Sequence, residues 1–434
     1  MELSTQPYKG ARDFYPEDMR LQKYIFSKWR QVCESYGYEE YTAPILENVE
    51  IYEAKSGQEI VNEEMYVFTD RGDRRVAIRP EMTPTVSRMV AGKRQELAYP
   101  LRWYSIPNLW RYDRPQRGRL REHWQLNVDI FGVEGVSAEH ELICLSDDQI
   151  QCFGAKRNMY EIRVNSRKFV DYLLKEYLLL DDVEAHTVAK LIDKMQKMSR
   201  GEFVALIEAA ISPSKRDGGV VDKLLAVLDA KDAKDLPPEL SSNKTLDGIG
   251  ELMTMLEASG VTNARFDVTL MRGFDYYTDI VFEVFDLHPD NNRSMFGGGR
   301  YDGLVGMFGV EPVPTVGFGQ GDVGMQLFLE SHNLMPAIYP ETELYIALVG
   351  DIYADVQVIV KNLRSEGVNV AIDATGKKIG AQIKSADKKG IHFVTVIGEE
   401  ELKSGRFKLK DLKTGKEEEM VIDRLITRVK DKRI

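Results

Sequence analysis

Five arginines lie within eleven residues of this chain, close enough together to bind an anion. They are Arg111, Arg114, Arg117, Arg119 and Arg121. Pro115 and Gly118 interrupt the segment, so the pattern predicts two strands joined by a basic loop. Guanidinium groups form paired, charge-assisted hydrogen bonds with phosphate oxygens, which favours a phosphorylated ligand. A solvated hairpin with scattered surface arginines fits the same pattern, so charge alone leaves both interpretations open.

The strand expected after the basic loop has one polar face. Gln125, Asn127 and Asp129 alternate with aliphatic residues at positions 126, 128 and 130. Because successive side chains of a strand point to opposite faces, the three polar groups share one face and the aliphatic groups turn to the core. A polar strand face beside a cationic loop suits an anionic substrate.

Short strand-like runs, broken by turns and helices, surround this segment. A helix is expected over residues 16–36, where apolar side chains recur at helical spacing. Strands are expected over residues 66–68, 75–78, 162–164, 264–268 and 280–284, and strand character continues to about residue 321. This order predicts an α+β fold, in which helices pack against a mostly antiparallel sheet.

Two changes of pattern divide the chain further. Residues 168–258 are helical in pattern, which predicts a helical insertion within a core of residues 1–334. Residues 335–341 have the composition of a linker. A separate α/β domain is expected over residues 342–434, with strand, helix, strand, helix and strand at 344–349, 353–367, 368–372, 379–389 and 393–397.

The composition is that of a globular protein. Of the 434 residues, 43% are hydrophobic and 29% are charged, and no apolar run is long enough to span a bilayer. The first ten residues lack the basic and apolar regions of a secretory signal. The three cysteines are odd in number and have no metal-ligand spacing, which favours a reducing cytoplasm.

The net charge of −11 does not exclude a polyanionic partner, because the charge is unevenly placed. Residues 342–434 carry 18 Lys and Arg against 15 Asp and Glu, so this part is mildly basic on an acidic body. A solvated surface of mixed charge would have the same composition. The charge distribution therefore permits a nucleic-acid partner and does not require one.

Six segments follow one another along almost the whole chain. They are residues 9–17, residues 36–47, residues 64–66 with Arg79-Pro-Glu-Met-Thr83, residues 111–132, Leu270-Met-Arg-Gly-Phe-Asp-Tyr-Tyr-Thr278 and Gly297-Gly-Gly-Arg-Tyr-Asp-Gly303. In this order they resemble the histidyl-tRNA synthetase family of class II aminoacyl-tRNA synthetases. The second segment resembles motif 1, which in that family builds the dimer interface, the fourth resembles motif 2, and the fifth resembles the histidyl-specific motif. The resemblance therefore implies a homodimer with an antiparallel class II catalytic core.

The resemblance implies an ATP-dependent reaction in two steps. The carboxylate of histidine attacks the α-phosphorus of ATP, which gives histidyl-adenylate and pyrophosphate, and the 3′ end of tRNA(His) then accepts the histidyl group. Such transfers depend on positioning and on neutralising charge, so fixed cations are the expected catalytic elements. The resemblance places Arg111 and Arg272 at the α-phosphate. It assigns no metal to the protein itself, and Mg²⁺ is expected mainly on the phosphates of ATP.

The resemblance also implies which residues bind the two substrates. Glu81, Thr83 and Gln125 are expected to hold the histidine ammonium, and on a strand Glu81 and Thr83 would share one face. Tyr276 and Tyr277 are expected to wall the imidazole, with one hydroxyl and one carboxylate pairing with its two nitrogens. The histidine-binding set is completed by Asp129, and the ATP-binding set is Arg111, Arg119, Gln125 and Arg272. Without the resemblance, Arg272 would instead be assigned to a salt bridge with Asp267 or Asp275.

Two positions depart from the family. Asp129 stands where the family generally has glutamate, one methylene longer. The third class II motif usually ends in a run whose arginine packs on ATP, whereas residues 316–330 contain neither Lys nor Arg. Some plastid-type members are similar in this respect. The adenine and γ-phosphate contacts are therefore unassigned.

Three other interpretations compete with this one. A catalytically idle relative that senses histidine or regulates its biosynthesis would lack both the histidyl-specific arginine and the C-terminal domain, and this chain has both. A class II synthetase for another amino acid is opposed by the 272–277 segment and by the Gln125–Asp129 strand. Gly319, Gly321 and Gly324 also match a dinucleotide-binding fingerprint, but the linker before Pro340 interrupts the βαβ unit which that site needs.

The C-terminal domain is expected, by resemblance, to contact the anticodon of the tRNA. Lys377, Lys378, Lys384 and Lys388 are candidate contacts to the tRNA backbone, and a solvated lysine face is the alternative. His123, next to the basic loop, is expected to be a packing residue and not an acid or base.

Overall fold

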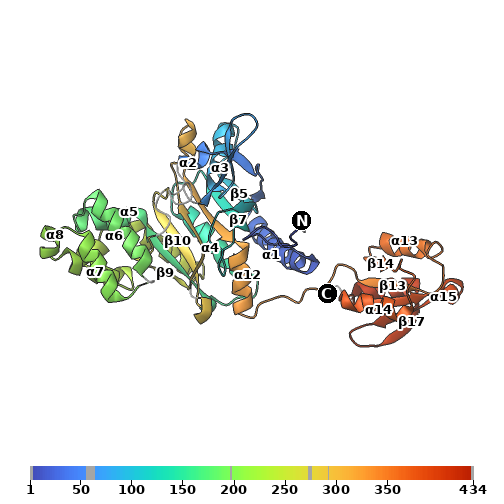
Figure 1. Ribbon diagram of the computed structural model, residues 1–434. Coiled ribbons are helices and arrows are strands. Elements are labelled where there is room, and N and C mark those ends of the chain that lie inside the picture. Colours follow the sequence, from blue (N-terminus) through green and yellow to red (C-terminus); the bar gives the residue numbers. More distant parts are fainter. Residues whose placement is uncertain (1–2, 55–63, 196–197, 272–275, 292, 432–434) are drawn as a thin grey trace. The chain divides into compact units, whose positions relative to one another are not determined.

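The computed structural model describes residues 3–54, 64–195, 198–271, 276–291 and 293–431. The chain divides into two compact units, shown in Figure 1. One comprises Met1–Asp13 and Tyr24–Met335, and the other comprises Phe14–Lys23 and Pro336–Ile434. The predicted N-terminal helix is confirmed as α1, Pro16–Ser35. Its apolar side chains recur at helical spacing, and Trp29 is fully buried.

A sheet of nine strands, counted over the described residues, forms the centre of the larger unit. Its order is β1-β5-β7-β12-β11-β10-β8-β9, and β6 pairs with the start of β7. The inner pairs are antiparallel, and β1 and β9 join the two edges in parallel. The predicted α+β class is confirmed. The strands are β1 Glu39–Glu40, β5 Leu101–Ser105, β6 Asn108–Trp110, β7 Glu122–Phe131, β8 Tyr160–Ser166, β9 Ala264–Phe266, β10 Ile280–Asp286, β11 Arg293–Arg300 and β12 Thr315–Gly321.

The two faces of this sheet differ as the strand alternation predicts. Leu126, Val128 and Ile130 of β7 are buried on the core face. On that face Tyr160 packs edge-on against Phe328 of one helix and hydrogen-bonds to Asp147 of another. Gln125, Asn127 and Asp129 lie on the opposite face. The helices that pack on the core side of the sheet are α4 Ser137–Gln151, α11 Asp247–Ala258 and α12 Asp322–Ser331. Figure 1 labels α4 and α12 beside the strands.

A second, three-stranded sheet carries the Arg79–Thr83 segment. Its order is β2-β4-β3, with β2 Leu46–Asn48, β4 Arg75–Ile78 and β3 Tyr66–Thr69, and α2 Glu50–Glu53 and α3 Thr83–Lys93 lie beside it. The idea that Glu81 and Thr83 share a strand face is wrong. Strand β4 ends at Ile78, and Thr83 is the first residue of α3. Pro84 explains this, because its fixed φ and missing N–H suit the first turn of a helix.

Between β8 and β9 the chain is helical, and these helices share their own apolar cluster. Leu174, Phe203, Leu224 and Leu240 are among its buried members. The helices of this region before α11 are α5 Arg167–Asp171, α6 Asp182–Lys194, α7 Arg200–Ala210, α8 Pro213–Asp217, α9 Val220–Leu228 and α10 Pro238–Ser241, with a π-helical turn at Tyr172–Tyr177.

The smaller unit contains the five alternating elements that the sequence predicts, with somewhat different ends. They are β13 Leu344–Leu348, α13 Gln357–Ser365, β14 Val370–Ile372, α14 Ile379–Lys388 and β15 Phe393–Ile397. Strands β14, β13 and β15 are parallel, as a βαβαβ run requires. The sheet continues beyond the prediction with an antiparallel hairpin, in the order β14-β13-β15-β16-β17. The additional elements are α15 Glu399–Ser404, β16 Arg406–Asp411, β17 Glu417–Val421 and α16 Ile422–Lys430.

Candidate functional site

The basic segment forms the loop of a hairpin between β6 and β7. At its base the amide of Arg111 donates to the carbonyl of Arg121, over 2.8 Å. At its tip Gln116 and Arg119 exchange two backbone hydrogen bonds of 2.9 Å each, which leaves Arg117 and Gly118 at the turn. The predicted arrangement of strand, basic loop and strand is therefore confirmed.

The arginines of this hairpin have different surroundings. Nε of Arg111 donates to the carbonyl of Pro80 over 2.9 Å, which fixes this guanidinium beside Glu81. Arg121 is buried, with its guanidinium 3.8 Å from the centre of the Tyr112 ring, and Nη1 donates to the Tyr8 hydroxyl. Arg121 is thus a structural residue that holds the hairpin against the N-terminal segment.

Arg119, a predicted ATP ligand, is paired with two carboxylates. Its Nε lies 2.7 Å from Asp113 and its Nη2 lies 3.5 Å from Glu64. Burial and the neighbouring Asp113 raise the pKa of Glu64 to about 7. The two acids and Arg119 therefore form one small charge cluster beside the hairpin, and Arg119 can meet a nucleotide only if it shares these partners or leaves them.

A row of glycines forms the floor of the site. Gly317, Gly319 and Gly321 of β12 lie opposite Asp129, Asn127 and Gln125. A Cβ atom at Gly319 would overlap the Gln125 amide, and one at Gly317 would overlap both Asp129 and Tyr301. The next strand continues the floor, because Gly297 and Gly299 of β11 pair with Gly319 and Gly317. Side chains here would fill the space into which Gln125 and Asp129 extend.

The carboxyl group of Asp129 has one partner among the described residues. The hydroxyl of Tyr301 donates to Oδ1, while Oδ2 is buried with no hydrogen bond. Burial raises the pKa of Asp129 to about 7. Burial and the Asp129 carboxyl raise the pKa of Tyr301 well above its ordinary value, so this hydroxyl is a donor. A buried acceptor without a partner is expensive unless a ligand supplies the donor.

Three tyrosines meet beside Asp129. The ring centres of Tyr276 and Tyr277 lie 4.8 Å apart, and that of Tyr301 lies 5.8 Å from Tyr276 and 6.4 Å from Tyr277. Burial raises the pKa of Tyr276 well above its ordinary value, and the charges of Tyr277 and Glu81 raise it further. A hydrogen bond with Thr83 lowers the same pKa. Glu81 and Thr83 therefore come close to this cluster even though they precede and begin a helix.

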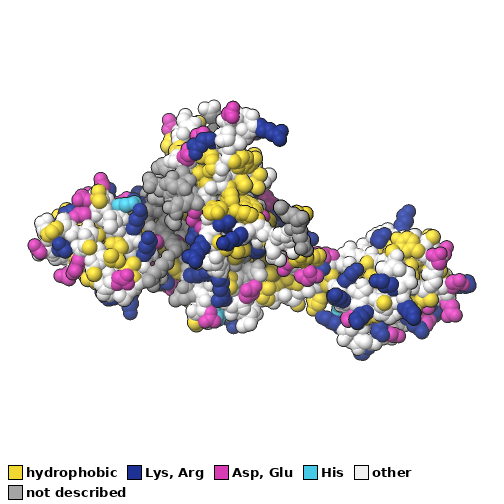
Figure 2. All heavy atoms as spheres, in the orientation of Figure 1, with side chains coloured by type: hydrophobic (Ala, Val, Ile, Leu, Met, Phe, Trp, Pro, Cys, Tyr) yellow, Lys and Arg dark blue, Asp and Glu magenta, His cyan; other side chains and the backbone are white. Residues whose placement is uncertain are grey.

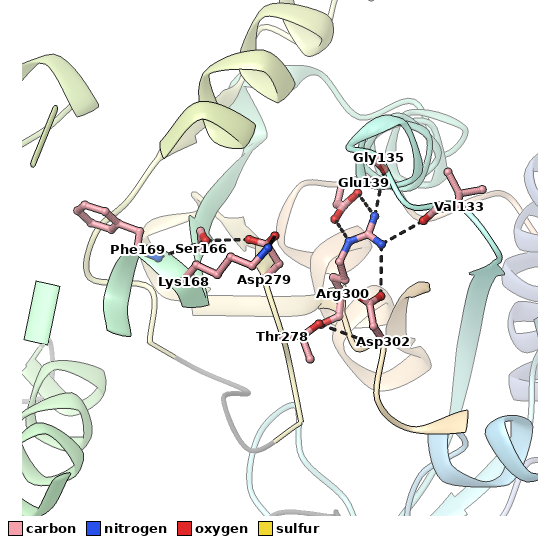
Figure 3. A network of polar contacts seen from close by, with 10 residues as sticks. All are labelled: Val133, Gly135, Glu139, Ser166, Lys168, Phe169, Thr278, Asp279, Arg300 and Asp302. Atoms are coloured by element: carbon pink, nitrogen blue, oxygen red, sulfur yellow. Dashed lines mark hydrogen bonds and ion pairs between the residues drawn. The ribbon is translucent and has the colours of Figure 1, made fainter. Parts of the chain in front are cut away.

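A polar network holds the ends of the segment that carries these tyrosines (Figure 3). Arg300 forms a paired ion pair with buried Glu139 of α4, at 2.7 and 2.8 Å, and donates to the carbonyls of Val133 and Gly135. The amide of Thr278 donates to the carbonyl of Arg300 over 2.8 Å. This backbone contact joins the residue that follows Tyr277 to the residue that precedes Tyr301, and so holds the two segments together.

His123 lies on the same face of β7 as Gln125. Burial, and then the charges of Arg111, Arg12 and Arg119, lower the pKa of His123 to about 3. The imidazole is therefore neutral at physiological pH, which agrees with a packing role and not with proton transfer.

Asp322, the first residue of α12, accepts a hydrogen bond from the amide of Trp124 and forms an ion pair with Arg12 at 2.7 Å.

Most of the predicted site residues lie together, and one arginine is an exception. Glu81, Thr83, Asp129, Tyr276 and Tyr277 lie close to one another, with Gln125 on the same strand face as Asp129. Arg272 lies outside the described residues, as does Asp275. Asp267, the other acid considered for it, pairs with Arg163 and Arg265 at 3.3 Å each. Sequence reasoning missed Tyr301, although its place directly after the glycines and Arg300 was a usable signal.

The dinucleotide-binding interpretation is wrong. Gly319 and Gly321 lie in β12, which is antiparallel to both of its neighbours, β7 and β11. A dinucleotide fold needs a parallel strand that returns after the helix.

Within the described part of the chain, no helix is both long and apolar enough to cross a membrane.

The antiparallel sheet, the basic hairpin and the polar strand above a glycine floor define the catalytic core of a class II aminoacyl-tRNA synthetase. Residues 10–320 match the family model described as histidyl-tRNA synthetase, and residues 343–432 match one described as an anticodon binding domain. The chain belongs to the histidyl-tRNA synthetase family.

Curated relatives and solved structures agree with this placement. The chain is 45% identical to a histidine–tRNA ligase of Leptospira biflexa, with 95% of this chain and 94% of the relative covered. It is 35% identical to that of Thermoplasma volcanium, with 98% of each covered. Its fold resembles the crystal structure of apo Staphylococcus aureus histidyl-tRNA synthetase, with a TM-score of 0.73, 25% identity and coverage of 98% of this chain and 100% of the other. The Nostoc enzyme gives a TM-score of 0.83 at 22% identity, covering 99% and 100%, and this likeness concerns the fold alone.

Proposed function

We propose that this protein activates histidine with ATP and transfers it to tRNA(His). The observation that carries the proposal is the surroundings of the Asp129 carboxyl group. A buried carboxyl oxygen has no hydrogen-bond partner, and its residue lies close to three tyrosines and opposite a glycine of β12. The basic hairpin leads into the same strand. An imidazole suits these groups chemically, because its ring can pack on the tyrosines and one ring N–H can supply the donor that Oδ2 lacks.

The roles of the other residues follow from charge and position. Glu81, Thr83 and Gln125 hold the ammonium group of histidine, for which a carboxylate and neutral oxygens are suitable acceptors. Arg111, fixed by Pro80 beside Glu81, meets the α-phosphate, and Arg272 provides the second guanidinium. Arg119 and Gln125 bind ATP. Fixed cations stabilise the charge that develops at the α-phosphorus when the carboxylate of histidine attacks.

Mg²⁺ accompanies ATP in this proposal and is held mainly by its phosphates. The described residues include no group of three or more His, Cys, Asp or Glu side chains placed to hold a metal ion. The ion offsets negative charge on the phosphates, and the basic hairpin provides the remaining positive charge.

The division of labour along the chain is also part of the proposal. Residues 1–334 form the catalytic core with a helical insertion at 168–258, residues 335–341 link it to the rest, and residues 342–434 bind the anticodon. Lys377, Lys378, Lys384 and Lys388 are all exposed on or next to α14, where they can contact the tRNA backbone. Figure 2 shows Lys and Arg side chains spread over the visible face of this unit.

We propose a homodimer built on the motif 1 region. Large apolar side chains are exposed on and beside β2 and β3, namely Ile45, Leu46, Val67 and Phe68, and Met307 and Phe308 are exposed as well. Figure 2 shows hydrophobic side chains gathered on the visible face near α3 and β5. An exposed apolar surface of this kind suits a protein interface.

A reducing, cytoplasmic location fits the free thiols of Cys33, Cys144 and Cys152, whose pKa values are raised by burial.

Charging of tRNA tests the proposed function. The full chain is incubated with ATP, Mg²⁺, labelled histidine and a tRNA(His) transcript, and acid-precipitable label is measured over time. We expect label to accumulate with tRNA(His) and not with a tRNA for another amino acid. A folded protein that binds histidine but never charges tRNA(His) would support the regulatory alternative instead.

A further inference from the structure

Arg293, the first residue of β11, reaches across to the tip of the basic hairpin. Its Nη1 donates to the carbonyl of Arg117 over 2.7 Å. Gly118 lies directly over this guanidinium with φ +76°, and a Cβ atom at Gly118 would come within 2.8 Å of the Arg293 Cζ atom. The turn of the hairpin is therefore shaped to rest on Arg293, which belongs to another strand of the sheet.

The charge of Arg293 is only partly offset by the described residues, because Asp286 acts on it without forming an ion pair. None of their carboxylates forms an ion pair with it, whereas Arg119 in the same hairpin has two such partners. Asp286, which lies opposite Arg293 in the strand register, is occupied by the Asn291 amide and His332. Burial, and then the like charge of Arg117, lower the pKa of Arg293, and the charge of Asp286 opposes this shift. A guanidinium that is held at the tip of a basic loop, and that forms no ion pair with the described carboxylates, can bind an anion.

The third motif leaves space beside β11, the strand that Arg293 begins. Gly324, in the first turn of α12, has no side chain, and its nearest outside neighbour would be the carbonyl of Met295, 3.6 Å from a Cβ atom. An ordinary side chain there would extend over β11, two residues from Arg293. The described residues of the third motif bring no cation to this place, and Arg293 brings one from the adjoining strand.

We infer that Arg293 binds the outer phosphates of ATP and takes the place of the cation that the third motif lacks. The hairpin sets the direction, because Arg111 at its base meets the α-phosphate and the tip that rests on Arg293 lies at the other end. Released pyrophosphate would hold the same contact. This inference rests on the proposed use of ATP and adds a residue for the phosphate chain.

Nucleotide binding to the full chain tests this role. Affinities for ATP and AMP are measured by calorimetry for wild type, Arg293→Met and, as a matched control, Arg94→Met. Arg94 also donates to one backbone carbonyl, that of Glu311, over 2.8 Å, but away from the hairpin. We expect Arg293→Met to bind ATP about tenfold or more weakly and to bind AMP within about twofold of wild type. Arg94→Met should bind both nucleotides as wild type does.

Two results would overturn the inference. One is unchanged ATP affinity in a folded Arg293→Met protein, and the other is an equal loss for ATP and AMP. A wild-type protein that shows no histidine-dependent exchange, while Arg293→Met still loses ATP affinity, would instead count against the proposed function and leave Arg293 as a phosphate ligand.

A double variant tests whether a guanidinium at position 324 can bind the same phosphates as the guanidinium of Arg293. Gly324→Arg is introduced into Arg293→Met, so that the guanidinium comes from α12 instead of β11. We expect the double variant to regain most of the lost ATP affinity. An undiminished loss in a folded double variant would contradict the assignment, because the space beside Met295 would then not belong to the phosphate site.

Discussion

The hydroxyl of Tyr301 donates a hydrogen bond to Oδ1 of Asp129, although 172 positions separate the two residues in the chain. The contact joins the end of the glycine-rich strand to the polar face of β7. It leaves Oδ2 buried without a hydrogen-bond partner. Tyr301 thereby fixes the orientation of a carboxylate that is one methylene shorter than the glutamate usual in the family.

Replacing Asp129 with Asn should stabilise the protein at alkaline pH and weaken histidine binding. Burial raises the pKa of Asp129 to about 7, well above the ordinary value of about 3.9. The higher pKa in the folded state stabilises the protein fully below about pH 4, where Asp129 is neutral in both states. This stabilisation is lost as the pH rises to about 7, because the unfolded chain can ionise Asp129 more easily. Above that range Asp129→Asn, which cannot ionise, should be more stable than wild type by about 2–4 kcal/mol.

Denaturant titrations at pH 8 and pH 5 measure this difference, and histidine affinity is measured in parallel. The gain in stability should be larger at pH 8 than at pH 5. Asp290→Asn, at an exposed turn, serves as the control and should give no such trend. A loss of stability at pH 8 would contradict the account of Asp129 as an acid whose ionisation is opposed by burial.

Replacing Gly319 with Ala should disable the site without unfolding the protein. The added methyl group would overlap the amide of Gln125, which must move off the face that binds both substrates. We expect a loss of about 100-fold or more in kcat/KM for ATP–pyrophosphate exchange, and destabilisation of about 1–3 kcal/mol. Gly303→Ala, where a Cβ atom meets open space, is the control and should keep its activity. Equal activity of the two variants would show that the glycine floor is not needed.

Replacing Arg300 with Met should destabilise the core strongly. Glu139 would be left as a buried carboxylate without its cation, and two backbone carbonyls would lose their donors. Breaking one side of such a pair costs about 3–5 kcal/mol. Arg200→Met removes an equally short but exposed pair with Asp229 and should change the melting temperature little. Similar losses for both variants would refute the special role of the buried network.

His123 should not appear in the pH profile of the reaction. Burial, and then three arginines, lower its pKa to about 3, so the imidazole stays neutral across the working range. The pH dependence of kcat for His123→Gln should therefore run parallel to that of wild type, even if its level is lower. If the acidic or basic limb of the pH profile of kcat disappeared in this variant, the assignment of His123 as a neutral packing residue would be contradicted.

The sequence predicted the hairpin and the polar face of β7 well, because both follow from local alternation and from the placement of Pro115 and Gly118. It failed at Glu81 and Thr83, where Pro84 starts a helix and the fold, not a shared strand face, brings the two residues to the tyrosines. The pairs Tyr301 with Asp129 and Arg293 with Arg117 join residues more than 170 positions apart. Such contacts depend on strand order and register, which local patterns do not specify.

The C-terminal unit shows the same limit. The alternation of strand and helix up to residue 397 was readable from hydrophobic periodicity. The hairpin of β16 and β17 was not, because its strands are short and carry many charged side chains on their outer face, as Lys408 and Glu419 illustrate. Charged alternation of this kind does not stand out from a surface loop until the pairing is known.

Histidine-dependent exchange of pyrophosphate into ATP tests the central claim most directly, because it reports adenylate formation without tRNA. The full chain is assayed with ATP, Mg²⁺ and labelled pyrophosphate against each of the twenty amino acids in turn. We predict rapid exchange with histidine and only background exchange with the other nineteen. Background exchange with histidine, or faster exchange with another amino acid, would contradict the assignment of the pocket around Asp129, Tyr276, Tyr277 and Tyr301.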